Sequence, residues 1–159
     1  MKKTIMSIAA IPLFYPVSMA QVLPGSPLKG LTEVMVIVED PPLEVAREGI
    51  TRDQLQKDVE LQLKQAGINV PKELGSFLHV NILGLKPANC QIYAFHIEVT
   101  LRQTVILDRE PPSKLDKCAT WKIGGISFVE MANLSKIRDE VKFYVDGFIN
   151  TWRFENSKK

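Results

Sequence analysis

The only two histidines of the chain, His79 and His96, are the residues best suited to chemistry. Each lies in a segment that alternates apolar and polar residues, as a half-exposed β-strand does. Pairing the two segments symmetrically about a turn at residues 86–89 sets His79 directly opposite His96, with Glu98 one pleat away on the same face. Two imidazoles and a carboxylate can hold zinc or copper, or share a proton near neutral pH.

Two interpretations of these residues stay open. In one, His79, His96 and Glu98 bind a metal or a small ligand, or serve an enzyme that uses no cofactor, with Arg102 holding an anion. In the other, they are the solvated side chains of an exposed strand. The sequence contains no G-x-S-x-G element, phosphate-binding loop, dinucleotide fingerprint or H-E-x-x-H motif. It therefore favours a protein that is not an enzyme, and we expect no cofactor.

The two cysteines, Cys90 and Cys118, raise the question of a disulfide, which is the usual state of paired cysteines in an exported protein. Cys90 precedes the third predicted strand, and Cys118 follows the hairpin at that strand's far end. About fifteen residues at ~3.3 Å each separate those ends, whereas a disulfide needs Cα atoms ~6 Å apart. The strand pattern thus favours two separate thiols, and a disulfide would mean that the third strand is broken or mispaired.

Four segments have strand patterns: residues 31–40, 76–83, 93–102 and 119–123. The first is apolar on both faces, and the second and third alternate apolar and polar residues. Gly124 and Gly125 interrupt the alternation of the fourth segment, so we expect that strand to end there.

Two segments have helix patterns. Thr51 and Gln54 form a capping box ahead of an apolar stripe, and Gly67 stands where a left-handed C-terminal cap belongs. Asn133 or Ser135 can cap the second helix. Its apolar stripe consists of Ile137, Val141, Val145, Phe148 and Trp152.

The order β-α-β-β-β-α predicts an α+β fold. We expect a two-layer sandwich in which a four-stranded, mainly antiparallel sheet carries both helices on the face of Tyr93, Phe95 and Ile97, leaving the other face open. This layout resembles small periplasmic domains that assist envelope assembly and transport, such as the lipopolysaccharide-assembly and ABC-transport auxiliary lipoproteins. The resemblance is one of topology over most of the chain after the leader, and it rests on no diagnostic motif.

The N-terminal residues predict export. Lys2 and Lys3 precede an apolar run from Ile5 to Tyr15, and small residues stand one and three positions before the bond that follows Ala20. We expect residues 1–20 to be a cleavable signal peptide, 21–30 an extended lead-in, and 31–156 a single domain. A buried N-terminal helix and an uncleaved anchor are the alternatives. The residue directly after the expected cleavage point is Gln21 and not a cysteine. The chain therefore differs from those lipoprotein families in lacking the cysteine that would carry a lipid anchor there.

The charge balance argues against binding to nucleic acid. The whole chain has 20 basic and 18 acidic residues, and loss of Lys2 and Lys3 with the leader makes the mature chain neutral. Nucleic-acid binders usually concentrate basic residues in a patch, and no run of this sequence does so. No apolar stretch after the leader is long enough to span a membrane.

These observations predict a periplasmic or secreted protein that binds a protein or an envelope component through its open sheet face or an edge strand. The glycines at 124 and 125 favour the fourth strand as that edge. Met35 and Ile37, on the outward side of the first strand, leave a homodimer open. The alternatives are the ligand-binding or enzymatic use of the histidines, and a secreted inhibitor or host-directed factor.

Overall fold

A computed structural model describes residues 26–73 and 75–157, so the signal peptide predicted for residues 1–20 lies outside the described residues. Four strands, three α-helices and one 3-10 turn make up the described part. In chain order they are β1 (Met35–Val38), α1 (Leu43–Arg47), α2 (Arg52–Gln65), β2 (Phe77–Leu85), β3 (Ile92–Leu107), β4 (Ser113–Glu130), the 3-10 turn (Met131–Asn133) and α3 (Lys136–Asn156).

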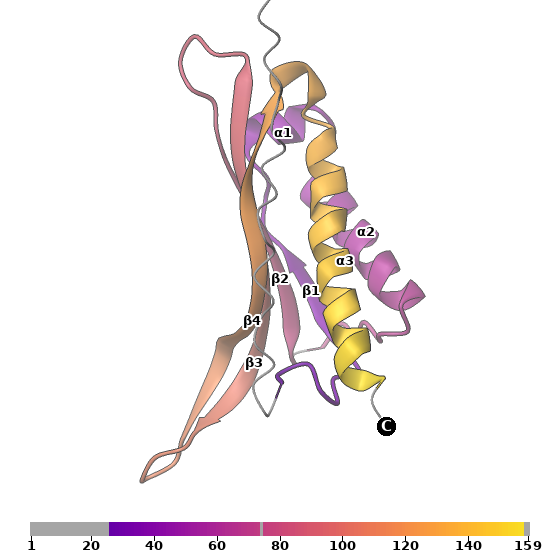
Figure 1. The fold of residues 1–159 in the computed structure, drawn as a ribbon, viewed down its shortest axis with the longest axis vertical. Coiled ribbons are helices and arrows are strands. Elements are labelled where there is room, and N and C mark those ends of the chain that lie inside the picture. Colours follow the sequence, from indigo (N-terminus) through magenta and orange to yellow (C-terminus); the bar gives the residue numbers. More distant parts are fainter. Residues whose placement is uncertain (1–25, 74, 158–159) are drawn as a thin grey trace, which may run out of the picture.

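The four strands form one sheet in the order β1-β2-β3-β4. β1 and β2 are parallel because the chain between them crosses over through α1 and α2, whereas β2, β3 and β4 follow one another as antiparallel hairpins. α2 and α3 lie together on one face of this sheet, as Figure 1 shows. The α+β sandwich expected from the sequence is confirmed, and α1 and the 3-10 turn are additions to the expected order.

The hydrophobic core fills the space between the sheet and the two long helices. Every second residue of β3 from Tyr93 to Leu101 is buried, which confirms the face predicted for the helices. Trp121 of β4 is half-buried and meets the ring of Phe148 edge-on, with centroids 5.2 Å apart. The other core residues of the sheet and helices are Leu78, Val80, Ile82, Leu55, Val59, Leu63, Ile137, Val141, Val145 and Ile149.

Two of the three helix-end features predicted from the sequence are observed. The Thr51 hydroxyl accepts a hydrogen bond from the backbone N–H of Gln54 at 3.3 Å, as the capping box predicts. Gly67 follows α2 with a φ of +90°, a conformation that glycine adopts without strain. Ser135 is the N-cap of α3, but its side chain makes no capping hydrogen bond.

The register of β2 and β3 differs from the symmetric pairing predicted about residues 86–89. His79 lies opposite Thr100, and His96 lies opposite Leu83, so the predicted cross-strand pair of histidines is wrong. β2 continues to Leu85, and the left-handed residue of the turn is Asn89, with a φ of +58°. The turn is therefore centred two residues later than predicted. This moves the pairing by four residues and keeps each side chain on its predicted face.

β4 does not end at Gly124 and Gly125 but runs through both to Glu130. A Cβ atom at Gly124 would collide with the carbonyl oxygen of Ile97, and one at Gly125 would collide with the hydroxyl of Tyr144. The two glycines thus permit close contacts with β3 and α3 inside a continuous strand.

The far ends of β3 and β4 leave the sheet as a two-stranded arm, residues 103–117, which projects well beyond β1 and β2 in Figure 1. Pairing is irregular where the arm begins, with register shifts between Leu101 and Arg102 and again between Gln103 and Val105. Lys117 has a φ of +60° at the same place. Such bulges bend a strand pair out of its sheet.

The lead-in predicted for residues 21–30 is described from Ser26 onward, and there it forms turns that pack on the domain. Leu28 is fully buried in the core. Asn156 of α3 accepts from the N–H of Gly30 at 2.7 Å and donates to the carbonyl oxygen of Leu28 at 2.8 Å. These contacts tie the last turn of α3 to the start of the domain.

Gly84 of β2 tests how tightly this core is packed. Alanine there is expected to lower the free energy of unfolding by about 1–3 kcal/mol, because its Cβ would collide with the buried ring of Tyr93. Gly75→Ala is the matched control, since no heavy atom lies within 4 Å of its Cβ position. Urea unfolding followed by circular dichroism measures both variants, and equal losses of stability would contradict this packing.

Candidate functional site

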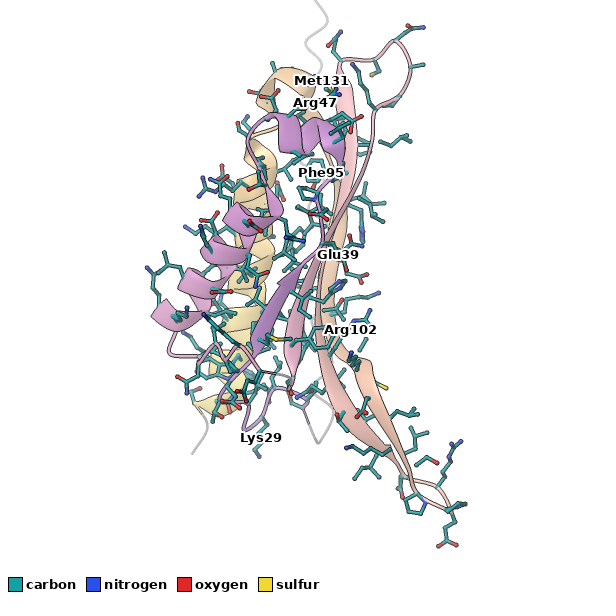
Figure 2. All side chains as sticks on the ribbon, turned by 180° about the vertical axis from the view of Figure 1, so that it is seen from behind. Lys29, Glu39, Arg47, Phe95, Arg102 and Met131 are labelled. Atoms are coloured by element: carbon teal, nitrogen blue, oxygen red, sulfur yellow. The ribbon has the colours of Figure 1, made fainter. Side chains whose placement is uncertain are left out.

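The open face of the sheet, turned away from α2 and α3, carries all four predicted site residues: His79, His96, Glu98 and Arg102. Figure 2 shows side chains, including the labelled Arg102, projecting on this side of the strands. The four residues share a face because they occupy alternate positions of paired strands. They do not form a single cluster, as their contacts show.

His79 is bound at the β1 side of the open face. Its Nε2 lies 2.8 Å from Oε1 of Glu39, and its side chain is 16% exposed. Because Thr100 is its cross-strand partner, His96 stands four residues along β3, about 13 Å away. The two imidazoles therefore cannot hold one metal ion or share one proton.

Glu98 is the centre of a small polar network. Its carboxylate accepts a hydrogen bond from the Thr100 hydroxyl at 3.0 Å and forms an ion pair with Lys122 of β4 at 3.3 Å. Partial burial alone would raise the pKa of Glu98, but the bonds from Thr100 and Lys122, with the charge of His96, outweigh it and lower that pKa. Glu98 is thus held as a carboxylate within the protein's own contacts.

Arg102 lies beside an open hollow of about 270 Å³ on the same face. Its guanidinium donates to the carbonyl oxygen of Lys117 at 3.3 Å, so it holds the chain where the arm begins. The hollow also includes Glu98 and Lys122, which are paired with each other. Of the predicted residues, only Glu98 and Arg102 are brought to one depression, and each already has a partner.

His96 stands in a different environment, among exposed apolar side chains. Leu83 of β2 and Ile126 of β4 flank it, and in the next row Leu85 and Phe128 flank Ala94. We call Leu83, Leu85, Ile126 and Phe128 the apolar patch. These four side chains are 58% to 71% exposed although they occupy regular strand positions. β3 separates the two leucines from Ile126 and Phe128, and its Ala94 and His96 lie between them. Together with these two residues the four side chains form one surface, because cross-strand neighbours on one face lie ~5 Å apart.

This patch was not predicted from the sequence. The second strand was predicted to end at Leu83 and the fourth at residue 123, which left Leu85, Ile126 and Phe128 outside any predicted element. A signal was present, since residues 126–129 are rich in side chains that favour strands. Gly124 and Gly125 suggested instead that the strand ends, because their packing against β3 and α3 involves residues that are distant in sequence.

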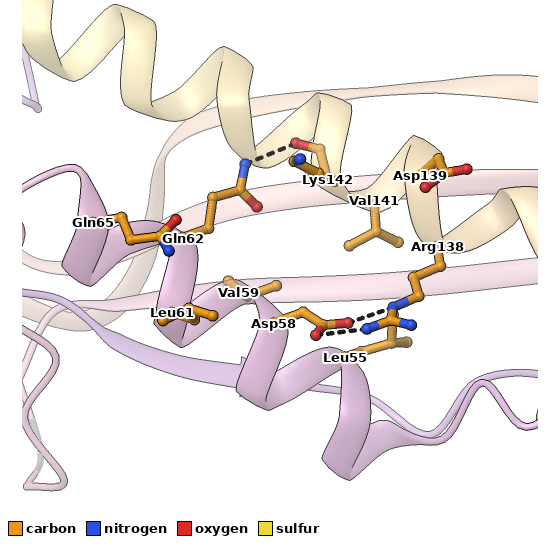
Figure 3. A pocket seen from close by; sticks show the side chains of 10 residues that line it. All are labelled: Leu55, Asp58, Val59, Leu61, Gln62, Gln65, Arg138, Asp139, Val141 and Lys142. Carbon is orange, nitrogen blue, oxygen red and sulfur yellow. Dashed lines mark hydrogen bonds and ion pairs between the residues drawn. The ribbon is translucent and has the colours of Figure 1, made fainter.

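A second depression, a groove of about 310 Å³, lies between α2 and α3 and is drawn in Figure 3. Three of its polar side chains, Asp58, Gln62 and Arg138, make hydrogen bonds between the helices. Arg138 donates to both carboxylate oxygens of Asp58, at 2.7 and 2.9 Å, and these bonds raise the pKa of the guanidinium. Gln62 donates to the Asp146 carboxylate at 2.6 Å and to the carbonyl oxygen of Lys142 at 3.1 Å. These bonds fasten the two helices together.

The two cysteines are both free. Cys118 lies opposite Gln103 at the base of the arm, whereas Cys90 precedes β3 at the other end. The separation predicted for the two thiols is thus confirmed. Within residues 26–73 and 75–157, no group of three or more His, Cys, Asp and Glu residues is placed to hold a metal ion.

Comparison with known proteins gives only weak similarity. No known family model matches the chain, and no curated protein sequence matches it. A solved structure, a minor lipoprotein from Acinetobacter baumannii, is similar over 76% of this chain and 94% of the lipoprotein, with 12% sequence identity and a TM-score of 0.34. A similarity of this degree establishes neither a family nor a function. In the described part of the chain, no helix is both long and apolar enough to cross a membrane.

The Glu98 network makes a prediction about acid stability. The folded state lowers the pKa of Glu98 below its ordinary value of 4.5, so its stabilising effect is complete above about pH 4.5 and is lost as the pH falls through the folded-state pKa. Glu98→Gln should therefore lower the melting temperature at neutral pH, and the deficit should shrink in acid. Thermal unfolding across pH measures this, with Glu110→Gln in the loop at the tip of the arm as control. A deficit that is the same at every pH would contradict the prediction.

Proposed function

We propose that this protein is an exported, non-enzymatic binding protein whose apolar patch takes up an apolar segment of another envelope protein. The observation that carries the proposal is the exposure of Leu83, Leu85, Ile126 and Phe128 on one face of paired strands. Contiguous apolar surface of this kind is uncommon on monomers and usually marks an interaction site.

The rest of the open face supports a binding role for the patch. The polar residues below it are paired among themselves, Glu98 with Lys122 and His79 with Glu39. Among residues 26–73 and 75–157, the side chains of the patch stay 58% to 71% exposed, and they are directed away from the helices. Covering them would remove apolar area from water, which is the main favourable term in protein association.

The proposed location rests on the leader-like N-terminus. Lys2 and Lys3, the apolar run and the small residues before Gln21 have the pattern of a cleavable secretory signal. We propose the periplasm, or the medium, as the site of action, and a protein or envelope component, not a nucleic acid, as the partner. The neutral charge of the chain after the leader supports the exclusion of nucleic acid.

A small-ligand function for His79, His96, Glu98 and Arg102 has weaker support. The register separates the histidines, and both Glu98 and Arg102 are engaged in contacts within the chain. A catalytic pair would need groups that converge on one reacting atom. That these four residues bind a ligand stays a prediction from the sequence.

Site-specific photo-crosslinking in cells tests the proposed function. A photoreactive amino acid at Leu83 should give a defined adduct with another envelope protein, because Leu83 lies within the patch. Leu43 of α1, exposed to a similar degree on a different element, is the matched control position and should not give that adduct. Leu85→Glu in the same chain should remove the adduct by placing a charge in the patch.

Adducts that are identical at positions 83 and 43, or that survive Leu85→Glu, would contradict the proposal. So would the absence of any adduct at position 83 in cells that export the folded protein. Mass spectrometry of each adduct identifies the crosslinked chain, and circular dichroism of the purified variants shows whether they fold.

A further inference from the structure

In the part of the chain that the structure describes, β4 forms an outer edge of the sheet. Within the described residues, β4 pairs with β3 alone. Its segment from Gly124 to Val129 contains no charged residue and no proline. Exposed edges usually carry such residues, because free backbone N–H and C=O groups otherwise pair with another strand.

We infer that β4 of one copy pairs antiparallel with β4 of a second copy about a twofold axis at Ile126, joining two sheets into one of eight strands. The axis is perpendicular to the sheet, so both open faces lie on the same side. A twofold contact of this kind uses the same residues in both copies. The junction uses Ile126 and Phe128, which also belong to the apolar patch, whereas Leu83 and Leu85 of β2 lie away from it. The pairing goes beyond the proposed function, and the two can be tested separately.

The open-face residues of β4 are complementary to themselves in this register. Ile126 meets Ile126, and two residues away on either side Gly124 meets Phe128. Four residues from the axis Lys122 meets Glu130, which gives two opposite-charge pairs per dimer. Gly124 is exposed, and an aromatic ring from a neighbouring strand can cover the backbone of such a glycine.

The neighbouring registers lack this complementarity. Moving the axis to position 125 sets Lys122 against Phe128, and moving it to position 127 sets Glu130 against Gly124. Either change removes both opposite-charge pairs. Regular pairing beyond Lys122 is also blocked, because β4 bulges where the arm turns out of the sheet. The charges and the bulge together select the axis at Ile126.

The helix layer supports the same contact. Tyr144 of α3 lies over Gly125 of β4, and Phe143 packs edge-on against its ring with centroids 5.4 Å apart. Phe143 is 64% exposed. Because α3 packs on β3 and β4, joining two copies at β4 would bring their α3 helices toward each other on the helix side of the joined sheet.

The first test is the oligomeric state of the chain from Gln21 onward, measured by sedimentation over a range of concentrations. The wild type should show a reversible monomer–dimer equilibrium. Ile126→Lys should raise the dimer dissociation constant at least about tenfold, because two like charges would meet on the axis. Ile106→Lys is the control: Ile106 is equally exposed, but it lies on the arm, so this variant should dimerise like the wild type.

A charge exchange tests the register itself. Lys122→Glu and Glu130→Lys should each weaken dimerisation, because each places like charges opposite one another. Mixing the two variants should restore it, since both cross-copy pairs are then of opposite charge. Lys122 also pairs with Glu98 in its own copy, so circular dichroism must show that each variant is folded.

A wild type that stays monomeric at every concentration would overturn the inference, as would a mixture no more dimeric than its components. Dimerisation that is equally sensitive to Ile126→Lys and Ile106→Lys would also overturn it. Crosslinking at Leu83 is a separate measurement, so loss of this dimer leaves the proposed function standing.

Discussion

The pairing of β2 with β3 is the constraint on which the rest of the structure depends. Val80 lies opposite Val99 and Leu78 opposite Leu101, and all four are buried under the helices. Because side chains alternate along a strand, this register also fixes which residues must face away from the core. Burial of one face by α2 and α3 therefore creates the open face, and the composition of that face decides what the molecule can contact.

The open face has a polar middle and an apolar end. The polar side chains of the middle have bonding partners within the chain, whereas the apolar side chains of the end are exposed. Glu98, Thr100 and Lys122 bond to one another, and Glu39 holds His79. The patch beside His96 stays exposed in the described part of the chain. The association role proposed for that end rests on this exposure, whereas the polar residues bond across neighbouring strands.

The sequence predicted what local periodicity controls. The alternation from Tyr93 to Leu101, the cap at Thr51 and the left-handed Gly67 are all observed, and the open face was assigned to the correct side of each strand. Register was predicted wrongly because the left-handed residue of the turn is Asn89, and nothing in the alternation marks where a turn is centred. The length of β4 was predicted wrongly because Gly124 and Gly125 are required by close contacts with Ile97 and Tyr144, which are distant in sequence. Because of the register error, the predicted site residues lie on one face of the sheet but do not form one site.

The central claim is that side-chain alternation along β2 and β4, with the helices on the other face, exposes the apolar patch to water in the isolated protein. Methyl-resolved NMR of the dilute chain from Gln21 onward, with a neutral paramagnetic probe in the solvent, measures this exposure directly. The account predicts strong broadening of the methyl signals of Leu83, Leu85 and Ile126, and little change for Leu78, Val80 and Ile82. Methyl groups of Leu83 that are as well shielded as those of Ile82 would contradict it.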